Sequence, residues 1–175
     1  MLIGIPEVMD VSKGEDTVRQ KITPYLWFDD NAEEVINFYV SIFKNSEIFH
    51  IQHYTEAGPR VPGTVLAISF RLDGQEFEAI NGGPHFKFTE VISFAIDCGS
   101  QEEVDQLWEK LTESGEPSQC GWLKDRFGLS WQVVPAILYE MLQDPDPERA
   151  TRVTQALYQM NQIDIAKLQQ AYDQA

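Results

Sequence analysis

The sequence has few cysteines, few basic residues and no long hydrophobic segment. Two cysteines among 175 residues, Cys98 and Cys120, exclude a disulfide scaffold and a four-cysteine zinc site. Thirteen lysines and arginines stand against 28 acidic residues, and the formal net charge is −15. A nucleic-acid-binding face must be basic, and an anionic membrane surface repels such a chain. We therefore expect neither nucleic acid nor membrane as a partner.

We expect no export signal in residues 1–20. No apolar run reaches membrane-spanning length, and residues 1–20 have no basic segment followed by a long apolar core. We expect a cytoplasmic protein whose first twenty residues form a weakly ordered extension. The whole sequence is 43% hydrophobic and 11% aromatic, which is enough for a folded core.

One pattern of strand, helix and further strands occurs twice. In the first copy, residues 21–30 predict a strand and residues 30–45 a helix capped by Asp30. Strands at 46–55, 64–72 and 75–81 follow, and Asp73-Gly74 predicts a tight hairpin turn between the last two.

The second copy begins near residue 89. Residues 89–98 predict a strand with Ile92 on its apolar face, and Ser100 with Glu103 predicts a capped helix. Residues 120–134 predict a hairpin whose turn contains Gly128. From Pro135, read as a first-turn proline, apolar stripes predict C-terminal helices, one of them capped by Asp146.

Five segments, in order, resemble one family. Two βαβββ-like units in tandem resemble the vicinal-oxygen-chelate superfamily of glyoxalases, bleomycin-resistance proteins and extradiol dioxygenases. Over about residues 21–172 the chain is similar to its PhnB-like branch, often labelled 3-demethylubiquinone-9 3-methyltransferase. The matching segments are ITPYLWFDDNAEEVINFY, INGGPHFKFTEVISF, CGWLKDRFGLSWQVVP, DPDPERATRV and QIDIAKL.

The resemblance implies an α+β fold in which tandem βαβββ modules form a cupped mixed sheet around a cleft, with C-terminal helices. We expect a glyoxalase-like domain at 21–134, with modules at 21–88 and 89–134, and a helical appendage at 135–175. It also implies a homodimer.

The resemblance further implies where a metal would bind in related enzymes. Carried over, the ligand positions fall near Pro24 or Tyr25, near Asn81, near Val91 and at Gln132. Proline, valine and neutral amides do not offset the dehydration of a divalent ion, so we predict no metal. The glycines at 82–83 precede a predicted strand and not a helix, which gives no support for a Rossmann-type cofactor site, and we predict no cofactor.

Several residues are candidates for a ligand site. The amides of Asn81 and Gln132 could bind a ligand, or they could be satisfied core amides. The indoles of Trp27, Trp122 and Trp131 could stack on a planar ligand, or they could be core residues. His85 and Tyr25 are candidates for proton transfer. Cys120 is interpreted as a small buried hydrophobe, with a nucleophile as the alternative.

Three functions remain open from the sequence. The first is a small-molecule-binding protein whose cleft holds a planar or oxygenated organic ligand at a degenerate metal site. The second is an enzyme of the same superfamily, an isomerase, a lyase, a dioxygenase-like enzyme or the methyltransferase of the family label. The third is an interaction module whose helices after Pro135 dock on a partner subunit.

Overall fold

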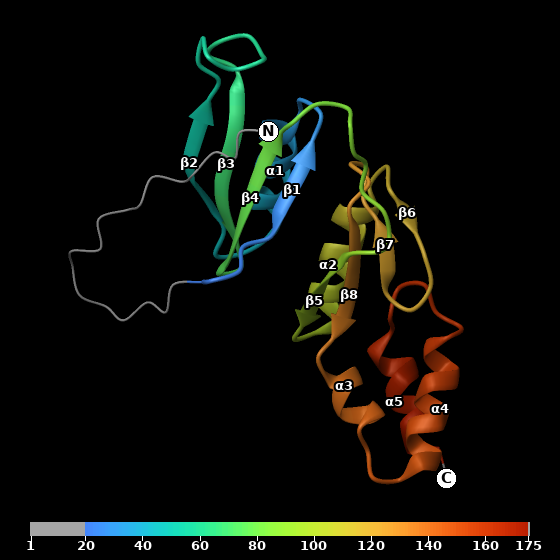
Figure 1. The fold of residues 1–175 in the computed structure, drawn as a ribbon. Coiled ribbons are helices and arrows are strands. Elements are labelled where there is room, and N and C mark those ends of the chain that lie inside the picture. The colour runs from blue at the N-terminus through green and yellow to red at the C-terminus, as the bar shows by residue number, and fades with distance from the viewer. Residues whose placement is uncertain (1–19, 175) are drawn as a thin grey trace, which may run out of the picture. The chain divides into compact units, whose positions relative to one another are not determined.

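The computed structural model describes residues 20–174, and the chain divides into two compact units, with Lys87 the last residue of the first and Phe88 the first residue of the second (Figure 1). The predicted N-terminal extension, apart from Gln20, lies outside the described residues. Among residues 20–174, no helix is long and apolar enough to cross a membrane.

The first unit is a βαβββ module. Its elements are β1 (Tyr25–Phe28), α1 (Ala32–Ile42), β2 (Glu47–His53), β3 (Val65–Leu72) and β4 (Gln75–Asn81). They form a four-stranded sheet in the order β1-β4-β3-β2. The β1 strand runs parallel to β4, and the other pairs are antiparallel.

The second unit repeats this topology. Its module consists of β5 (Ser93–Cys98), α2 (Gln101–Thr112), β6 (Glu116–Pro117), β7 (Trp122–Lys124) and β8 (Ser130–Pro135). The sheet order is β5-β8-β7-β6, and β5 runs parallel to β8. The predicted tandem of βαβββ modules is therefore confirmed, with a separate four-stranded mixed sheet in each unit.

Local sequence signals explain several of these elements. Asp73 and Gly74 both have positive φ, 44° and 85°, as the tight turn between β3 and β4 requires. The hydroxyl of Ser100 accepts a hydrogen bond from the backbone N–H of Glu103 at 3.2 Å. The carboxylate of Glu103 in turn accepts from the backbone N–H of Gly99 at 2.8 Å, so the predicted cap of α2 is confirmed.

Three local predictions are wrong. Asp30 does not cap α1, because the N-cap residue is Asn31 and the first helical N–H, that of Ala32, donates to the side chain of Asn81 instead. Pro135 ends β8, and α3 starts only at Ile137. Ile92 does not lie on the apolar face of a strand, because β5 begins only at Ser93, and the Ile92 side chain is exposed.

The C-terminal helices are part of the second unit. They are α3 (Ile137–Leu142), α4 (Pro147–Leu157) and α5 (Ile165–Asp173), shown in orange to red in Figure 1. Asp146 caps α4 as predicted, accepting from the backbone N–H of Glu148 at 2.9 Å. Buried side chains of this segment form one cluster with Val134 of β8: Leu138, Met141, Val153, Met160, Ile163 and Leu168.

Candidate functional site

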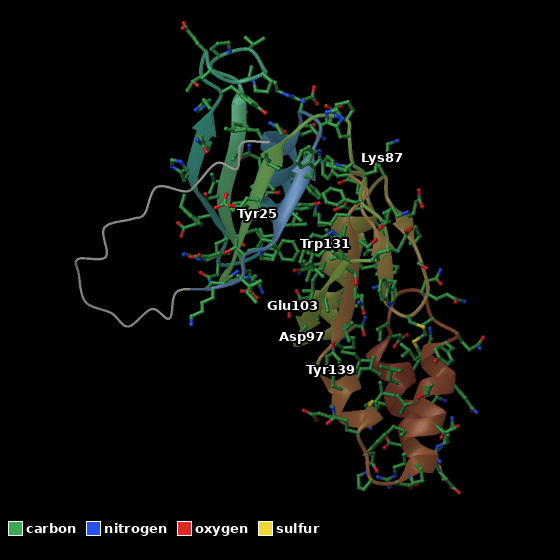
Figure 2. All side chains as sticks on the ribbon, viewed as in Figure 1. Tyr25, Lys87, Asp97, Glu103, Trp131 and Tyr139 are labelled. Carbon is green, nitrogen blue, oxygen red and sulfur yellow. The ribbon has the colours of Figure 1, made fainter. Side chains whose placement is uncertain are left out.

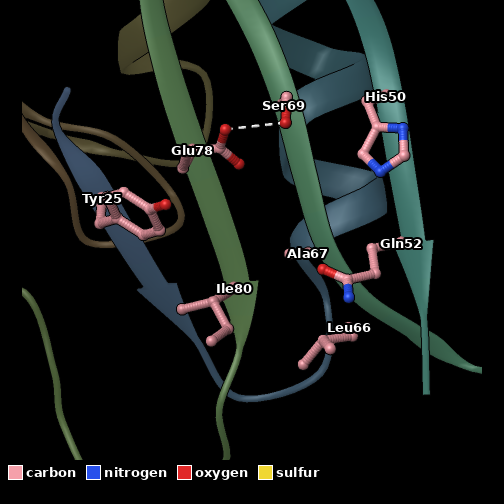
Figure 3. A pocket seen from close by; sticks show the side chains of 8 residues that line it. All are labelled: Tyr25, His50, Gln52, Leu66, Ala67, Ser69, Glu78 and Ile80. Atoms are coloured by element: carbon pink, nitrogen blue, oxygen red, sulfur yellow. Dashed lines mark hydrogen bonds between the residues drawn. The ribbon is translucent and has the colours of Figure 1, made fainter. Parts of the chain in front are cut away.

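Within the first unit, one face of the sheet packs on α1, and no other described element of that unit covers the second face, called the open face below. Side chains alternate between the two faces along each strand. In β4, Phe77, Ala79 and Asn81 are buried, while the intervening Glu78 and Ile80 belong to the opposite face. On β1, Tyr25 lies on the open face and is 50% exposed. Figure 3 shows this open face, with α1 behind the sheet.

Four polar side chains from four strands share one line across the open face. The strand register pairs Tyr25 with Glu78, Glu78 with Ser69, and Ser69 with His50. We call these four residues the polar row. They lie far apart in the sequence, and the register alone brings them together.

The polar row contains a half-buried carboxylate. Ser69, only 4% exposed, donates a hydrogen bond from its hydroxyl to Oε1 of Glu78 at 2.7 Å. Burial raises the pKa of Glu78, an effect opposed by the Ser69 hydrogen bond and the charge of His50 and reinforced by the charge of Glu76. Burial, and then the negative charge of Glu78, raise the pKa of Tyr25.

The polar row lies between an ionic row and a mainly apolar row. On one side, Arg71 forms ion pairs with Glu47 and Glu76 at 2.7 and 3.2 Å. On the other side the register aligns Trp27, Ile80, Ala67 and Gln52. A shallow depression follows the two rows and is lined by Tyr25, His50, Gln52, Leu66, Ala67, Ser69, Glu78 and Ile80 (Figure 3). Such a surface offers polar anchoring groups beside an apolar floor.

A carbon-detected NMR titration of the Glu78 carboxyl is expected to give a midpoint above 4.5, the ordinary glutamate value. The raised pKa means that the folded protein binds this proton more tightly than the unfolded chain. The favourable contribution of this group to stability is therefore present at low pH and is lost as the pH rises through the folded pKa.

Ser69→Ala is the matched variant for this titration. It removes the hydrogen bond that holds the pKa of Glu78 down, so the midpoint is expected to rise further. A wild-type midpoint at or below 4.5 would contradict the half-buried carboxylate on which the site depends.

Asn81, a predicted ligand-binding residue, is engaged inside the first unit. Its Oδ1 accepts from the backbone N–H of Ala32 at 2.9 Å, and its Nδ2 donates to the carbonyl of Val65 at 3.0 Å. The amide therefore joins the start of α1 to the start of β3. It belongs to the face that carries α1, one residue out of step with Ile80 on the open face.

Trp27 lies on the open face, beside the polar row. Its indole N–H donates to the carbonyl of Gly83 at 2.8 Å, and the ring of Phe86 meets it edge-on with centroids 5.0 Å apart. A Cβ on Gly82 would lie 2.1 Å from the indole ring, so this position needs glycine for the close approach. The predicted glycine-rich turn thus holds a tryptophan, and no helix follows it before α2 among the described residues.

The two tryptophans predicted in the second unit have different surroundings. Trp131 is 3% exposed, and its indole N–H donates to Oδ2 of Asp125 at 2.9 Å, which places it in the core. Trp122 pairs in register with Gln132, and both are partly exposed. The side-chain amide of Gln132 donates to the hydroxyl of Ser93 at 2.9 Å.

Glu78 and Gln132 occupy the same position in the repeated modules. Phe28 ends β1 and pairs with Asn81, and Cys98 ends β5 and pairs with Pro135. Asn81 lies three residues after Glu78, and Pro135 lies three residues after Gln132. The family resemblance placed one metal-ligand position of the first module near Asn81, whereas the strand pairing puts Glu78 at the position equivalent to Gln132.

The other predicted reactive residues do not join the polar row. His85 is exposed in the segment after β4, beyond the end of β4 that pairs with Phe28, whereas Tyr25 lies at the opposite end of β1. Burial raises the pKa of Cys120, which disfavours the thiolate that a nucleophile requires. Burial also raises the pKa of Cys98, to about 12.

The residues at the expected metal position do not fit a metal ion. Within residues 20–174, no group of three or more histidine, cysteine, aspartate or glutamate side chains could hold one. The first module offers the single carboxylate of Glu78 beside a tyrosine hydroxyl, and the equivalent position of the second module is the amide of Gln132. One carboxylate does not offset the dehydration of a divalent ion.

Untagged protein incubated with nickel, zinc, manganese or iron and then desalted is expected to retain far less than one ion per chain. Elemental mass spectrometry measures this content, and Glu78→Gln is the matched control. Near-stoichiometric metal in the native chain that disappears in Glu78→Gln would contradict a degenerate site.

Comparisons with known proteins give consistent results. Residues 20–134 match the family profile described as 3-demethylubiquinone-9 3-methyltransferase. The chain is 40% identical to the PhnB protein from Bacillus cereus, with a TM-score of 0.62, over 67% of this chain and all of that one. No curated protein matches.

Two more distant structures share the fold. Protein PA1353 from Pseudomonas aeruginosa is 18% identical, with a TM-score of 0.54, over 64% of this chain and 94% of that one. The fosfomycin resistance protein FosX from Listeria monocytogenes is 18% identical, with a TM-score of 0.51, over 73% and 99%. At 18% identity, the two structures show a shared fold and nothing about function.

Proposed function

Because the chain belongs to the 3-demethylubiquinone-9 3-methyltransferase family, a PhnB-like branch of the vicinal-oxygen-chelate superfamily, we propose that it binds a small oxygenated organic molecule. The binding surface is the depression on the open face of the first sheet. The single observation that carries this proposal is the polar row, in which Tyr25, Glu78, Ser69 and His50 share one register line.

The chemistry of the depression suits an uncharged ring better than an ion. Leu66, Ala67 and Ile80 give an apolar floor, and Trp27 stands at the end of the row that contains Ile80. Small-molecule sites in proteins combine such apolar walls with a few placed polar groups. The polar row supplies those groups, and the proposal requires no metal.

A screen of small aromatic and oxygenated compounds by ligand-observed NMR tests this function. We expect binders whose signals lose their protein-induced broadening in the double variant Tyr25→Phe/Glu78→Gln. The double variant Trp122→Phe/Gln132→Leu is the matched control, because it changes the equivalent surface of the second module. Binders lost in the control and retained in the first variant would overturn the proposed location.

The adjacency of Tyr25 and Glu78 also favours a second candidate, an enzyme that transfers a proton. A general base works best when its pKa lies near the working pH, and the pKa of Glu78 is raised in that direction. Solvent deuterium exchange into dihydroxyacetone, followed by proton NMR, tests this candidate. Exchange at the same rate with the wild type and with Glu78→Gln would exclude Glu78 as the base.

A further inference from the structure

At the β1 end of the polar row, the carboxylate of Glu78 lies beside the hydroxyl of Tyr25. Oε1 of Glu78 is taken by the hydroxyl of Ser69. Among the described residues, Oε2 of Glu78 and the hydroxyl of Tyr25 form no hydrogen bond to the protein. In Figure 3 the Tyr25 hydroxyl is directed toward the strand that carries Glu78. A carboxylate oxygen can only accept, whereas the tyrosine hydroxyl can donate.

The charges around this pair disfavour an anionic ligand. Glu78, on β4, is flanked by Tyr25 of β1 and Ser69 of β3, with His50 of β2 next along the row. The charges of His50 and of Glu76, on the same strand as Glu78, act on its carboxylate. Arg71, in the neighbouring ionic row, already forms ion pairs with two glutamates. A carboxylate or phosphate placed here would meet Glu78 without a guanidinium of its own.

We propose that the polar row binds the ring hydroxyl of a neutral ligand, such as a phenol or a cyclic enol. The ligand O–H donates to Oε2 of Glu78, and the ligand oxygen accepts from the hydroxyl of Tyr25. The ring then covers Leu66, Ala67 and Ile80. This inference names the ligand class of the proposed function and rests on it.

Hydrogen-bond matching favours a hydroxyl over an ammonium group. An ammonium ion has three donors and loses a strong hydration shell on binding, whereas Oε2 of Glu78 and the hydroxyl oxygen of Tyr25 accept at most two of them. A ring hydroxyl has one donor and can accept one hydrogen bond, which is what Glu78 and Tyr25 offer together. The raised pKa of Glu78 agrees with an environment that resists charge, and it predicts that binding weakens as the pH falls through that pKa.

Four probes of similar size test this inference on the full-length protein: phenol, anisole, benzoate and benzylammonium. Amide NMR shifts report where and how strongly each one binds. We expect phenol to bind with a dissociation constant of about 1–10 mM, typical of so small a ligand. Anisole, which cannot donate, should bind at least about tenfold more weakly, because it loses a hydrogen bond to a charged group. The shifts should centre on the amides of Tyr25, Ser69 and Glu78.

Glu78→Gln and Glu76→Gln form a matched pair of variants on the same strand and face. The first is expected to weaken phenol binding about tenfold and to remove its dependence on pH. The second is expected to leave the affinity at neutral pH unchanged and to move the pH dependence to lower pH, because the charge of Glu76 helps to raise the pKa of Glu78. Equal binding of phenol and anisole, or stronger binding of benzoate or benzylammonium at this face, would overturn the ligand class and leave the proposed site standing. No shift at this face with any probe would overturn the proposed site as well.

Discussion

A chain that ends at Pro135 is expected to lose the folded state of its second unit. The helices α3, α4 and α5 pack on the end of β8, where Val134 joins a buried cluster that includes Leu138 and Ile163. The backbone N–H groups of Cys120 and Gly121 donate to the carbonyls of Met160 and Asn161, which the truncation removes. Exposing this apolar surface and these donors costs more than a small domain can lose. Dispersion of the second-unit amide signals in NMR measures the outcome.

Two full-length variants calibrate this result. Leu168→Ala, at a fully buried position of the cluster, is expected to lower the free energy of unfolding by about 3 kcal/mol. Tyr158→Ala, at a 62% exposed position nearby, should change it by less than about 0.5 kcal/mol. A truncated chain whose second unit stays dispersed would instead favour the helices as an appendage that docks on a partner.

The second large effect is expected at a buried aspartate in the turn between β7 and β8. Asp125 is 3% exposed, and its Oδ1 accepts from the backbone N–H groups of Phe127 and Leu129 at 2.9 and 3.0 Å. Its Oδ2 accepts from the indole of Trp131 at 2.9 Å. Asp125→Ala leaves three donors without these acceptors, so the free energy of unfolding should fall by about 4 kcal/mol.

Chemical denaturation of a short series tests the assignment. Asp125→Asn keeps an oxygen for the two backbone donors and places an amide N–H₂ against Trp131 if that oxygen faces the backbone, so its loss should be intermediate. Asp30→Ala, at an exposed aspartate, should have a small effect. Equal stability of Asp125→Ala and Asp30→Ala would show that the carboxylate does not hold the turn together.

The module topology was predictable because local signals repeat. Alternating apolar residues, the Asp73-Gly74 turn and the Ser100 cap each depend on neighbours in the sequence, and the order of elements follows from them. The start of α1 was not predictable in this way. Its N–H group is satisfied by Asn81, 49 residues away, which no local cap rule can find.

The candidate site was less predictable, because it depends on which face of each strand is buried. Polar and apolar residues do not alternate along β8, so its buried face could not be predicted from the sequence. In the structure Trp131 is buried and Gln132 is partly exposed. In β4 the alternation of Phe77, Ala79 and Asn81 does indicate the buried face. Glu78 follows from that alternation once the two modules are aligned strand by strand, and this was the signal that sequence reasoning missed.

A crystal structure of the protein soaked with phenol locates the bound ring without any assumption about activity. We expect the phenol hydroxyl to lie within hydrogen-bond distance of Glu78 and Tyr25, with the ring over Ile80. A phenol bound only elsewhere, for example beside Trp122 and Gln132, would contradict the assignment of the polar row as the ligand site.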